Sequence, residues 1–356
     1  MAEEGKRQGD FGAALRWLLG MAAVVIVVAG LRAAQPLVVP FLIAAFLAVI
    51  CGPPLQWLQD KRVPTVLALL MVIAGASLIF LFVVGVVGAS INDFVHNLGK
   101  YQEQLGAQQA QLVGWLHDLG LNVPEHVTAG DFNAKRLMGF FASLLSSLGG
   151  VLSNTFLVLL TLVFILLEAS GFRGKLIAIC GDSSPGLENA TRIRQSIRHY
   201  VSIKTGISLA TALAVFVWLK ILGIDYPMLW SLLAFFFNFV PNIGSIIASV
   251  PPVLLALVQF GPGRALVAGM GFLVIHGLIG NVLEPRIMGK GLGLSTLVVF
   301  TSLVFWGWVL GPVGMLLSVP LTMIGKIVLE ASAETRWLAI LLGPDELSST
   351  NQKGEV

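Results

Sequence analysis

The stretch from residue 277 to 295 places polar residues between two long apolar runs. Small and polar side chains recur there at positions i, i+3, i+4 and i+7, which share one face of an α-helix; they are Gly277, Gly280, Asn281 and Glu284. A carboxylate in an apolar segment is costly to bury, so a functional role is the first hypothesis for it. Glu284 is therefore the first candidate for a proton- or cation-binding acid, with Asn281 as a polar ligand or orienting group.

The residues that follow Glu284 add a second hypothesis. Pro285 should end or kink the helix and leave Arg286 close to the carboxylate, as its charge partner. The alternative to a functional acid is a structural pair of Glu284 and Arg286 that fixes the helix end at the membrane interface. His276, two turns earlier, is expected to be a hydrogen-bonded packing residue rather than a proton relay.

Two apolar runs, residues 227–257 and 294–329, are interrupted in their middle. The interrupting residues are Pro241, Gly244 and Pro251 in the first run and Pro312, Gly314 and Pro320 in the second. Each proline removes a helical hydrogen bond and disfavours helix just before it, so both runs are predicted to break. A Ser-Val-Pro sequence recurs at an offset of 69 residues, which indicates a weak internal repeat; chance similarity of apolar segments is the alternative.

Broken helices at membrane depth predict a site. Hydrocarbon does not satisfy the freed backbone groups, so such breaks lie inside protein or beside a water-filled cavity. The exposed ends of half-helices suit a small polar solute or an ion, together with the neutral groups of Asn242, Ser245 and Ser249. Ordinary proline kinks are one alternative. A re-entrant hairpin is another, because residues 227–240 form a helix of only about 21 Å. We expect the two breaks to meet close to Glu284.

The composition determines which elements must position these residues. Of the 356 residues, 56% are hydrophobic and 12% are charged, which is more apolar surface than one soluble core can bury. A bilayer-spanning helix needs about 20 apolar residues. Runs of about this length occupy residues 13–33, 36–58, 64–90, 147–168, 204–222, 227–257, 264–284 and 294–329. We predict an all-α polytopic membrane protein with about eight membrane segments, two of them broken or re-entrant.

Positive charges predict how these segments are oriented. With the N-terminus inside and alternating spans, most lysines and arginines of the short loops lie on the cytoplasmic side, and both termini are cytoplasmic. The net charge of +3 then reflects topology and gives no reason to expect a nucleic-acid partner. Cys51 and Cys180 would lie where thiols stay reduced, so no disulfide is expected.

Two polar segments divide the chain. Residues 91–146 have an amphipathic pattern with interleaved glutamines, which predicts an extracytoplasmic helix that packs on its neighbours or serves self-association. Residues 169–203 predict a basic helix in the membrane interface, with a gating arm as the alternative. The expected divisions are 1–90 (three membrane segments), 91–146 (the insert), 147–203 (the fourth segment and the basic arm), 204–335 (the transport core) and 336–356 (a cytoplasmic tail).

Catalytic motifs are missing from the sequence. It contains no H-E-x-x-H, G-x-S-x-G or G-x-x-x-x-G-K-[ST] pattern, so it lacks the groups of a metalloprotease, a serine hydrolase and an ATP-driven pump. The spacing of the histidines in the insert matches no metal site. We expect neither enzymatic activity nor a cofactor or bound metal.

The C-terminal half contains a more specific block of residues. Its members are Asn281, Glu284, Pro285, Arg286, Ile287 and Gly289, with Pro241, Gly244, Pro251, Gly311, Gly314 and Pro320 around them. This block resembles the signature of the autoinducer-2 exporter family of bacterial membrane proteins, and the similarity extends over most of the chain. The resemblance implies eight membrane segments in the inner membrane, a homo-oligomer and secondary transport. Some members export a furanone-type quorum signal and others exchange sodium or lithium ions for protons, so the resemblance leaves the substrate open.

The expected function is therefore secondary transport of a small polar solute, or of a monovalent cation and protons, by alternating access. A passive channel also uses broken helices and is one alternative, and a non-transporting membrane scaffold is another. Under the transport hypothesis, Gly244→Leu and Gly314→Leu should damage transport while leaving the protein folded.

Overall fold

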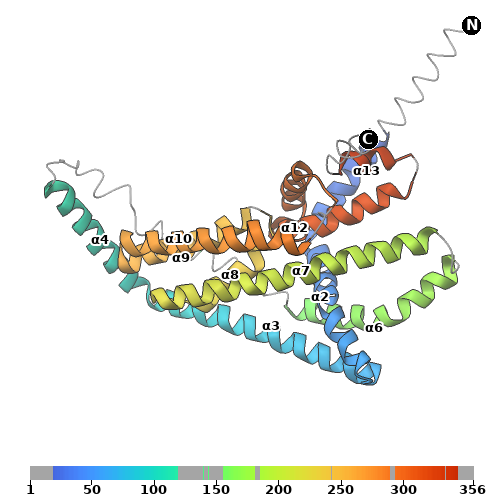
Figure 1. The fold of residues 1–356 in the computed structure, drawn as a ribbon, viewed down its shortest axis with the longest axis horizontal. Coiled ribbons are helices and arrows are strands. Elements are labelled where there is room, and N and C mark those ends of the chain that lie inside the picture. Colours follow the sequence, from blue (N-terminus) through green and yellow to red (C-terminus); the bar gives the residue numbers. More distant parts are fainter. Residues whose placement is uncertain are drawn as a thin grey trace, which may run out of the picture.

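The computed structural model describes residues 19–118, 139, 143, 155–180, 185–241, 243–288, 293–332 and 334–343. These residues are helical and contain no strand, which confirms the predicted all-α class (Figure 1). After a first helix at Leu19–Ala33, the elements are α2 (Gln35–Asp60), α3 (Thr65–His96), α4 (Leu98–Asp118), α6 (Thr155–Cys180), α7 (Pro185–Leu222), α8 (Pro227–Phe237), α9 (Ile243–Phe260), α10 (Pro262–Leu278), a π-helical turn η2 (Ile279–Leu283), α11 (Glu284–Met288), α12 (Thr296–Glu330) and α13 (Arg336–Leu341).

Six described helices are long and apolar enough to cross a membrane, judged by length and composition alone. They are Gln35–Asp60, Thr65–His96, Ala190–Leu222, Ile243–Phe260, Pro262–Met288 and Thr296–Glu330. Leu19–Ala33, Phe156–Glu168 and Pro227–Phe237 are apolar but shorter. The eight predicted runs therefore locate the apolar segments correctly. Parts of the first and fourth runs, at 13–18 and 147–154, lie outside the described residues.

Helix α7 is the element on which most of the others pack. It contacts α8, α10, α2, α12, α11 and α6, and it runs across the middle of the molecule, with the α8–α10 group along one half and α12 near the other (Figure 1). The sequence predicts two elements here, a basic arm and a separate fifth span, but a single helix of 38 residues covers both. The reason is local, because after the first turn this segment contains no proline and only one glycine, Gly206.

The insert begins later than predicted. Helix α3 continues past residue 90 to His96, and Asn97 separates it from α4. Helix α4 confirms the amphipathic helix expected in this segment and packs against α9. Tyr101 is almost fully buried in this contact. The rest of the insert, apart from residues 139 and 143, lies outside the described residues.

The first broken run folds back on itself as a hairpin in which α8, the turn at residues 238–241 and α9 follow one another, and we call it the first hairpin. Helices α8 and α9 pack against each other. The two ends of the hairpin are joined, because the Asp225 backbone N–H donates to Gln259 Oε1 at 3.3 Å and the Gln259 amide donates to the Asp225 carboxylate. Residues just before α8 and at the end of α9 therefore lie at the same end of the molecule.

The second broken run, α12, also folds back, and we call it the second hairpin. Gly311 has φ 68° and ψ −152°, which interrupts the helix. Trp306 Nε1 donates to Thr322 Oγ1 at 3.1 Å, whereas a straight helix would hold residues of this separation about 24 Å apart. The ends are joined here as well, because the Lys326 ammonium donates to the Gly293 carbonyl.

Both broken runs are thus hairpins rather than kinked spans, which decides between two alternatives that the sequence leaves open. The turns lie at 238–241 and at Gly311, so Pro241 and Pro312 lie at the breaks. Pro251 and Pro320, also predicted as break residues, lie inside α9 and the second arm of α12. That part of the prediction is wrong, because a proline removes one hydrogen bond, and a packed helix can continue through that loss.

Each hairpin contains the same kind of close internal contact, between a glycine and a backbone carbonyl. A Cβ built on Gly244 would lie 1.8 Å from the Phe237 carbonyl oxygen, and a Cβ built on Gly314 would lie 1.9 Å from the Trp306 carbonyl oxygen. Both glycines are buried. The same contact at both turns gives the predicted repeat a physical basis, since only glycine lets the returning helix approach the carbonyl of the first helix so closely.

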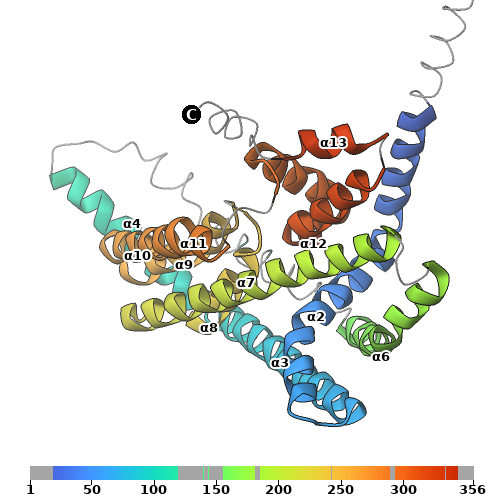
Figure 2. The same cartoon turned by 45° about the vertical axis from the view of Figure 1, so that its right-hand side comes forward.

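No extensive packing between the two hairpins is found among the described residues, contrary to the prediction that they meet. The first packs on α7, α10, α3 and α4, and the second packs on α7, α2 and α13. The two views place them at different positions along α7 (Figures 1 and 2). Phe46 of α2 links them indirectly, because its ring meets that of Phe239 in the first turn at 5.4 Å and also packs on the cluster that contains Val319 of the second hairpin.

Candidate functional site

The predicted acid lies at an irregular turn of its helix. Residues Ile279–Leu283 form a π-helical turn, and α11 begins directly after it at Glu284. The Glu284 N–H donates to the Ile279 carbonyl five residues earlier, which is the π pattern. The sequence predicts that Pro285 ends or kinks the helix. The proline does not end it, because the helix is irregular at the π turn just before the proline and continues from there to Met288. Such single π turns occur frequently at functional sites.

Glu284 forms an ion pair with Lys204 of α7, which the sequence does not predict. The Lys204 side chain is 6% exposed and the Glu284 side chain 20% exposed. Arg286, the predicted partner, is exposed, and no ion pair between it and Glu284 is found among the described residues. Residues two apart on a helix point in different directions, so Arg286 faces away from the side of α11 that contacts α7.

Lys204 belongs to a buried polar face of α7. This face repeats at i, i+4, i+8 and i+11, and its members are Tyr200, Lys204, Ser208 and Thr211, all nearly inaccessible to solvent. The Ser208 hydroxyl accepts a hydrogen bond of 3.0 Å from the side-chain amide of Asn238, which lies at the turn of the first hairpin. One turn of α7 thus connects the ion pair to the break in the first hairpin.

The same face of α7 also approaches the second hairpin. Tyr200 and Val201 pack in one apolar cluster with Leu294, Val319 and Met323, which belong to the second hairpin and the segment before it. Tyr200 is also within electrostatic reach of Glu284. The ion pair therefore lies beside one face of α7 that contacts both hairpins, although the described parts of the hairpins do not pack extensively on each other.

A buried ion pair is an unusual structure to maintain. Removing two charges from water costs several kcal/mol per ion, and the attraction between them offsets this only with good geometry. Replacing both charges by apolar residues would often stabilise a protein. Packing alone therefore does not explain why this membrane protein has the pair. Its position next to a π turn and a helix that contacts both hairpins makes a functional role the first hypothesis.

The other predicted site residues differ in their exposure and in the groups they contact. Asn281 is exposed, and Asn242 lies outside the described residues. The Ser249 hydroxyl donates to the Ile246 carbonyl within α9 at 2.9 Å, so it serves its own helix. Ser245 is half-buried at the start of α9 and takes part in an interaction within the structure. For Asn281 and Ser249, no interaction with Glu284 is found among the described residues.

The two glycines of the stripe before Glu284 are not close to another helix among the described residues. A Cβ at Gly277 or Gly280 would meet no atom within 4 Å. His276 also differs from the prediction of a hydrogen-bonded packing residue, because its buried Nε2 has no partner among the described residues. It stacks instead on Phe272, with the rings 6.0 Å apart.

The sequence does contain a pattern that points to Lys204, although the position of this lysine beside an apolar run makes the pattern easy to miss. Lys204 lies at the start of a long apolar run, where a lysine reads as a loop residue on the cytoplasmic side. The fourfold spacing from Tyr200 through Ser208 would have identified a polar face within one helix. The pairing itself could not have been read from spacing, since Glu284 is 80 residues away in the chain.

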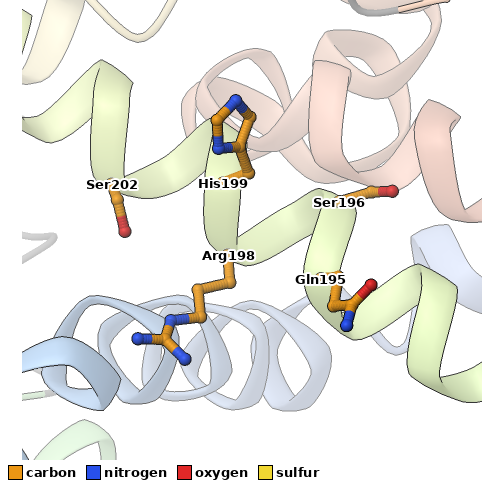
Figure 3. Close-up of a pocket in the computed structure, with 5 residues that line it drawn as sticks. All are labelled: Gln195, Ser196, Arg198, His199 and Ser202. Carbon is orange, nitrogen blue, oxygen red and sulfur yellow. The ribbon is translucent and has the colours of Figure 1, made fainter. Parts of the chain in front are cut away.

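An open cleft along α7 is not the site. It is lined by Gln195, Ser196, Arg198, His199 and Ser202. Figure 3 shows that these side chains leave α7 in different directions, with Arg198 pointing towards one neighbouring helix and His199 pointing to the opposite side. They do not converge on one point, so they form no binding site for a small solute.

Polar contacts also join the elements at both ends of α7. Near Leu222, the Tyr101 hydroxyl of α4 donates to the Asp225 carboxylate at 2.8 Å and lies 3.1 Å from the Tyr226 hydroxyl. Burial, together with these two hydrogen-bond partners, raises the pKa of Tyr101. At the other end, Arg192 of α7 pairs with Glu330 of α12 at 3.1 Å.

The fold and the site define a polytopic helical membrane protein with a charged pair among broken helices, an arrangement typical of membrane transporters. A family model described as "AI-2E family transporter" matches residues 21–334. The chain therefore belongs to this transporter family, which confirms the resemblance seen in the sequence.

Individual relatives cover nearly the whole chain. The AI-2 transport protein TqsA of Escherichia coli is 40% identical over 325 residues, which is 91% of this chain and 94% of TqsA. A putative transport protein of Haemophilus influenzae is 39% identical over 337 residues, covering 93% and 97% of the two chains. The putative transport protein YhhT of Escherichia coli is 36% identical over 327 residues, covering 92% and 94%. This chain is thus a multi-pass protein of the bacterial inner membrane with a role in transport.

Proposed function

We propose that this chain is a secondary transporter that exports a small polar solute of the autoinducer-2 type, with Glu284 and Lys204 at the centre of its polar pathway. The observation that supports this most strongly is the buried ion pair between α11 and α7, placed one helical turn from the Asn238–Ser208 hydrogen bond at the first break. A carboxylate, an ammonium and neutral hydrogen-bonding groups together suit a solute that carries hydroxyl and carbonyl groups. The similarity to TqsA, an AI-2 transport protein, supports the solute class.

The second candidate function is exchange of sodium or lithium ions for protons. It is favoured by the Glu284 carboxylate itself, because hard monovalent cations bind oxygen ligands and broken helices supply carbonyl oxygens next to it. In this function Glu284 is the coupled acid, and Asn281 supplies or orients a neutral ligand from the exposed side of the π turn. Arg286, Asn242, Ser245 and Ser249 are secondary members of the pathway in both functions.

Transport by alternating access distinguishes this proposal from a passive channel and from a scaffold. A carrier shows saturable counterflow in proteoliposomes, whereas a channel shows unsaturated flux at much higher rates. A scaffold would tolerate replacement of the acid without loss of its cellular role.

The test is a flux assay with purified protein in proteoliposomes. Export of autoinducer-2 and uptake of sodium are measured under sodium and proton gradients, for wild type and for Glu284→Gln. Glu168→Gln is the matched control, because Glu168 also pairs with a lysine, Lys175, but both side chains are more than half exposed. We expect Glu284→Gln to abolish flux of the true substrate and Glu168→Gln to leave it unchanged. Normal flux in Glu284→Gln would refute the proposed site.

We also propose a cytoplasmic location for both termini and a homo-oligomeric assembly. If each hairpin returns to the side from which it enters, each removes one crossing from the predicted eight, so the two termini still share one side. This arrangement moves Arg286 and Lys290 to the cytoplasmic side and Arg264 to the outer side, a net gain of one positive charge inside. Cysteine-accessibility labelling at positions 261 and 293 tests it, with labelling from outside expected only at 261.

A further inference from the structure

We infer that helix α4 is a clamp on the base of the first hairpin, and that this clamp must open, by rotation of α4 about Asn97, for the hairpin to move during transport. The clamp is the contact between one face of α4 and the residues at the base of the hairpin. Its members are Asn97, Tyr101, Gln104 and Gln108 on one side and Asp225, Tyr226, Gln259 and Gly261 on the other. The inference goes beyond the polar site described above, and its transport step rests on the proposed function.

Polar side chains hold α4 on the base of the hairpin. The Tyr101 hydroxyl donates to the Asp225 carboxylate at 2.8 Å and lies 3.1 Å from the Tyr226 hydroxyl. The side-chain amide of Asn97 also donates to the Tyr226 hydroxyl, at 3.4 Å. Helix α4 is not among the helices that are long and apolar enough to cross a membrane, so water can replace these partners when the contact opens. Opening therefore costs less than the separation of an apolar surface of the same size.

The closed clamp also contains two unfavourable features. The Oε1 atom of Gln104 is buried and has no hydrogen-bond partner among the described residues, so it loses its hydrogen bonds to water without replacement. Tyr226 has φ 60° and ψ 42°, in the left-handed region that residues other than glycine rarely adopt. Strain of this kind persists only where the surroundings hold it. The hydrogen bonds from Tyr101 and Asn97 thus hold the clamp closed against these two costs.

Helix α4 is attached in a way that allows it to rotate as a unit. It is joined to α3 by the single residue Asn97, whose φ of −89° and ψ of 2° interrupt the helix. The Asn97 amide donates to the Asp93 carbonyl at 2.8 Å, so the end of α3 is capped without any help from α4. Beyond this hinge, α4 packs mainly on α9, and it lies at one end of the molecule (Figure 1). Its departure from the base therefore leaves α3 intact.

The clamp is connected to the polar site through the hairpin itself. The hydrogen bonds between Asp225 and Gln259 do not involve α4, so they keep the two arms of the hairpin together when the clamp opens. Because α8 and α9 also pack against each other, a displacement of the base carries the turn with it. The turn holds Asn238, which bonds to Ser208 one helical turn from Lys204. The clamp thus determines whether the hairpin can leave its position on the polar face of α7.

The first test measures opening by hydrogen–deuterium exchange in the purified full-length protein in detergent. Helices owe most of their stability to tertiary packing, so the amides of α4 and of residues 222–232 exchange faster when α4 leaves the base. Tyr101→Phe removes a hydrogen bond of the closed clamp and should speed this exchange about fivefold, which is about 1 kcal/mol. Gln104→Leu removes the buried acceptor and should slow it about fivefold. Gln102→Leu, at an exposed position of α4, is the matched control and should exchange as wild type does.

The second test measures export of autoinducer-2 in proteoliposomes by the same variants. We expect Gln104→Leu to lower the maximal rate about fivefold and to leave the half-saturating concentration unchanged, because the variant closes the clamp without touching the polar site. Tyr101→Phe should raise the maximal rate, and Gln102→Leu should not change it. A purely structural role of α4 predicts the opposite pattern, in which the tighter contact leaves the rate unchanged and the looser contact lowers it.

Three outcomes are decisive. Equal exchange in wild type, Tyr101→Phe and Gln104→Leu would show that α4 does not act as a clamp. Slower exchange in Gln104→Leu with a wild-type rate of export would show that transport does not need the clamp to open. Absence of flux in every protein, wild type included, would instead refute the proposed function, and the exchange rates would still decide whether the clamp opens.

Discussion

The two hairpins have the same backbone design but different surroundings. Each hairpin turns at a break in the helix, and hydrogen bonds join its two ends. Each also contains a buried glycine at which an added Cβ would lie less than 2 Å from a carbonyl oxygen. The first hairpin places Asn238 at its turn, where the side chain bonds to the polar face of α7. The second has Gly311 at its turn and presents Val319 and Met323 to the same helix.

This difference separates contacts that build the hairpins from polar contacts that we expect to serve transport. The glycine contacts are common to both hairpins, so they belong to the construction of a re-entrant element. Among the described residues, the buried polar face of α7 bonds to the first hairpin through Asn238 and to α11 through Glu284, whereas the second hairpin meets the same face with apolar side chains. Mutations that affect both hairpins equally should therefore act on folding, and mutations that affect only the first should act on transport.

The largest effects are expected at the two glycines. Gly244→Ala and Gly314→Ala should each abolish the folded protein, because even one methyl carbon would overlap a backbone carbonyl. This revises the expectation from sequence that leucine at either position would leave the protein folded. Gly325→Ala in α12 is the control, since a Cβ there meets nothing within 4 Å. Fluorescence-detected size-exclusion chromatography measures the amount of folded protein. If the Gly314→Ala variant folds and the Gly244→Ala variant does not, the two glycine contacts are not equivalent.

The next largest effect is expected at the ion pair. Lys204→Met leaves the Glu284 carboxylate buried without a partner and should lower the free energy of unfolding by about 3–5 kcal/mol. Arg192→Met also removes an ion pair, with Glu330, but Arg192 is 61% exposed, so the loss should be below about 1 kcal/mol. Equilibrium unfolding in denaturant compares the two variants. Equal losses would mean that burial does not distinguish the two ion pairs that α7 forms.

A smaller effect is expected at the turn of the first hairpin. Asn238→Ala leaves the Ser208 hydroxyl without its buried donor and should cost about 1–3 kcal/mol. Ser208→Ala should cost a similar amount, and the double variant should cost less than the sum, because both remove the same hydrogen bond. Transport should fall in all three variants. Additive losses in this double-mutant cycle would show that the two side chains are energetically independent.

The smallest effect is expected at Tyr101, which joins α4 to the base of the first hairpin. Tyr101→Phe removes the hydrogen bond to Asp225 and should cost about 1 kcal/mol. Because burial raises the pKa of Tyr101 above its ordinary value of 10.0, the folded protein retains the neutral phenol at a pH where the unfolded chain loses the proton. The stability difference between wild type and Tyr101→Phe should therefore be full below pH 10 and shrink above it. A difference that stays constant to higher pH would contradict the assignment.

Local chemistry in the sequence is enough to single out Glu284 as a candidate acid and to predict that two apolar runs are broken, although only Pro241 and Pro312 of the predicted prolines lie at the breaks. Glu284 inside an apolar run, and proline with glycine inside two others, are visible without any contact information. The sequence does not show whether the chain continues across the membrane or turns back at Pro241 and Gly311. That outcome depends on contacts between residues distant in the sequence, such as the hydrogen bond between Asp225 and Gln259. Sequence spacing carries no information about such pairs.

The charge partner was mispredicted for a related reason. Arg286 is close to Glu284 along the chain, whereas Lys204 is close in space because α10 and α11 pack along α7. The continuity of α7 could have been inferred from the lack of proline after its first turn. That inference would have moved Lys204 from a loop to a helix interior and made it a candidate.

The position of α7 before both hairpins in the chain has a consequence for biogenesis. A re-entrant turn exposes backbone groups that lipid does not satisfy, so neither hairpin is stable in the bilayer alone. The ribosome completes α7 before it reaches α8 or α12, and N-terminal elements generally fold first during synthesis. The nascent chain thus already holds the docking surface when each hairpin emerges. A circular permutant that begins at α8 should insert poorly even though every contact of the finished protein remains available to it.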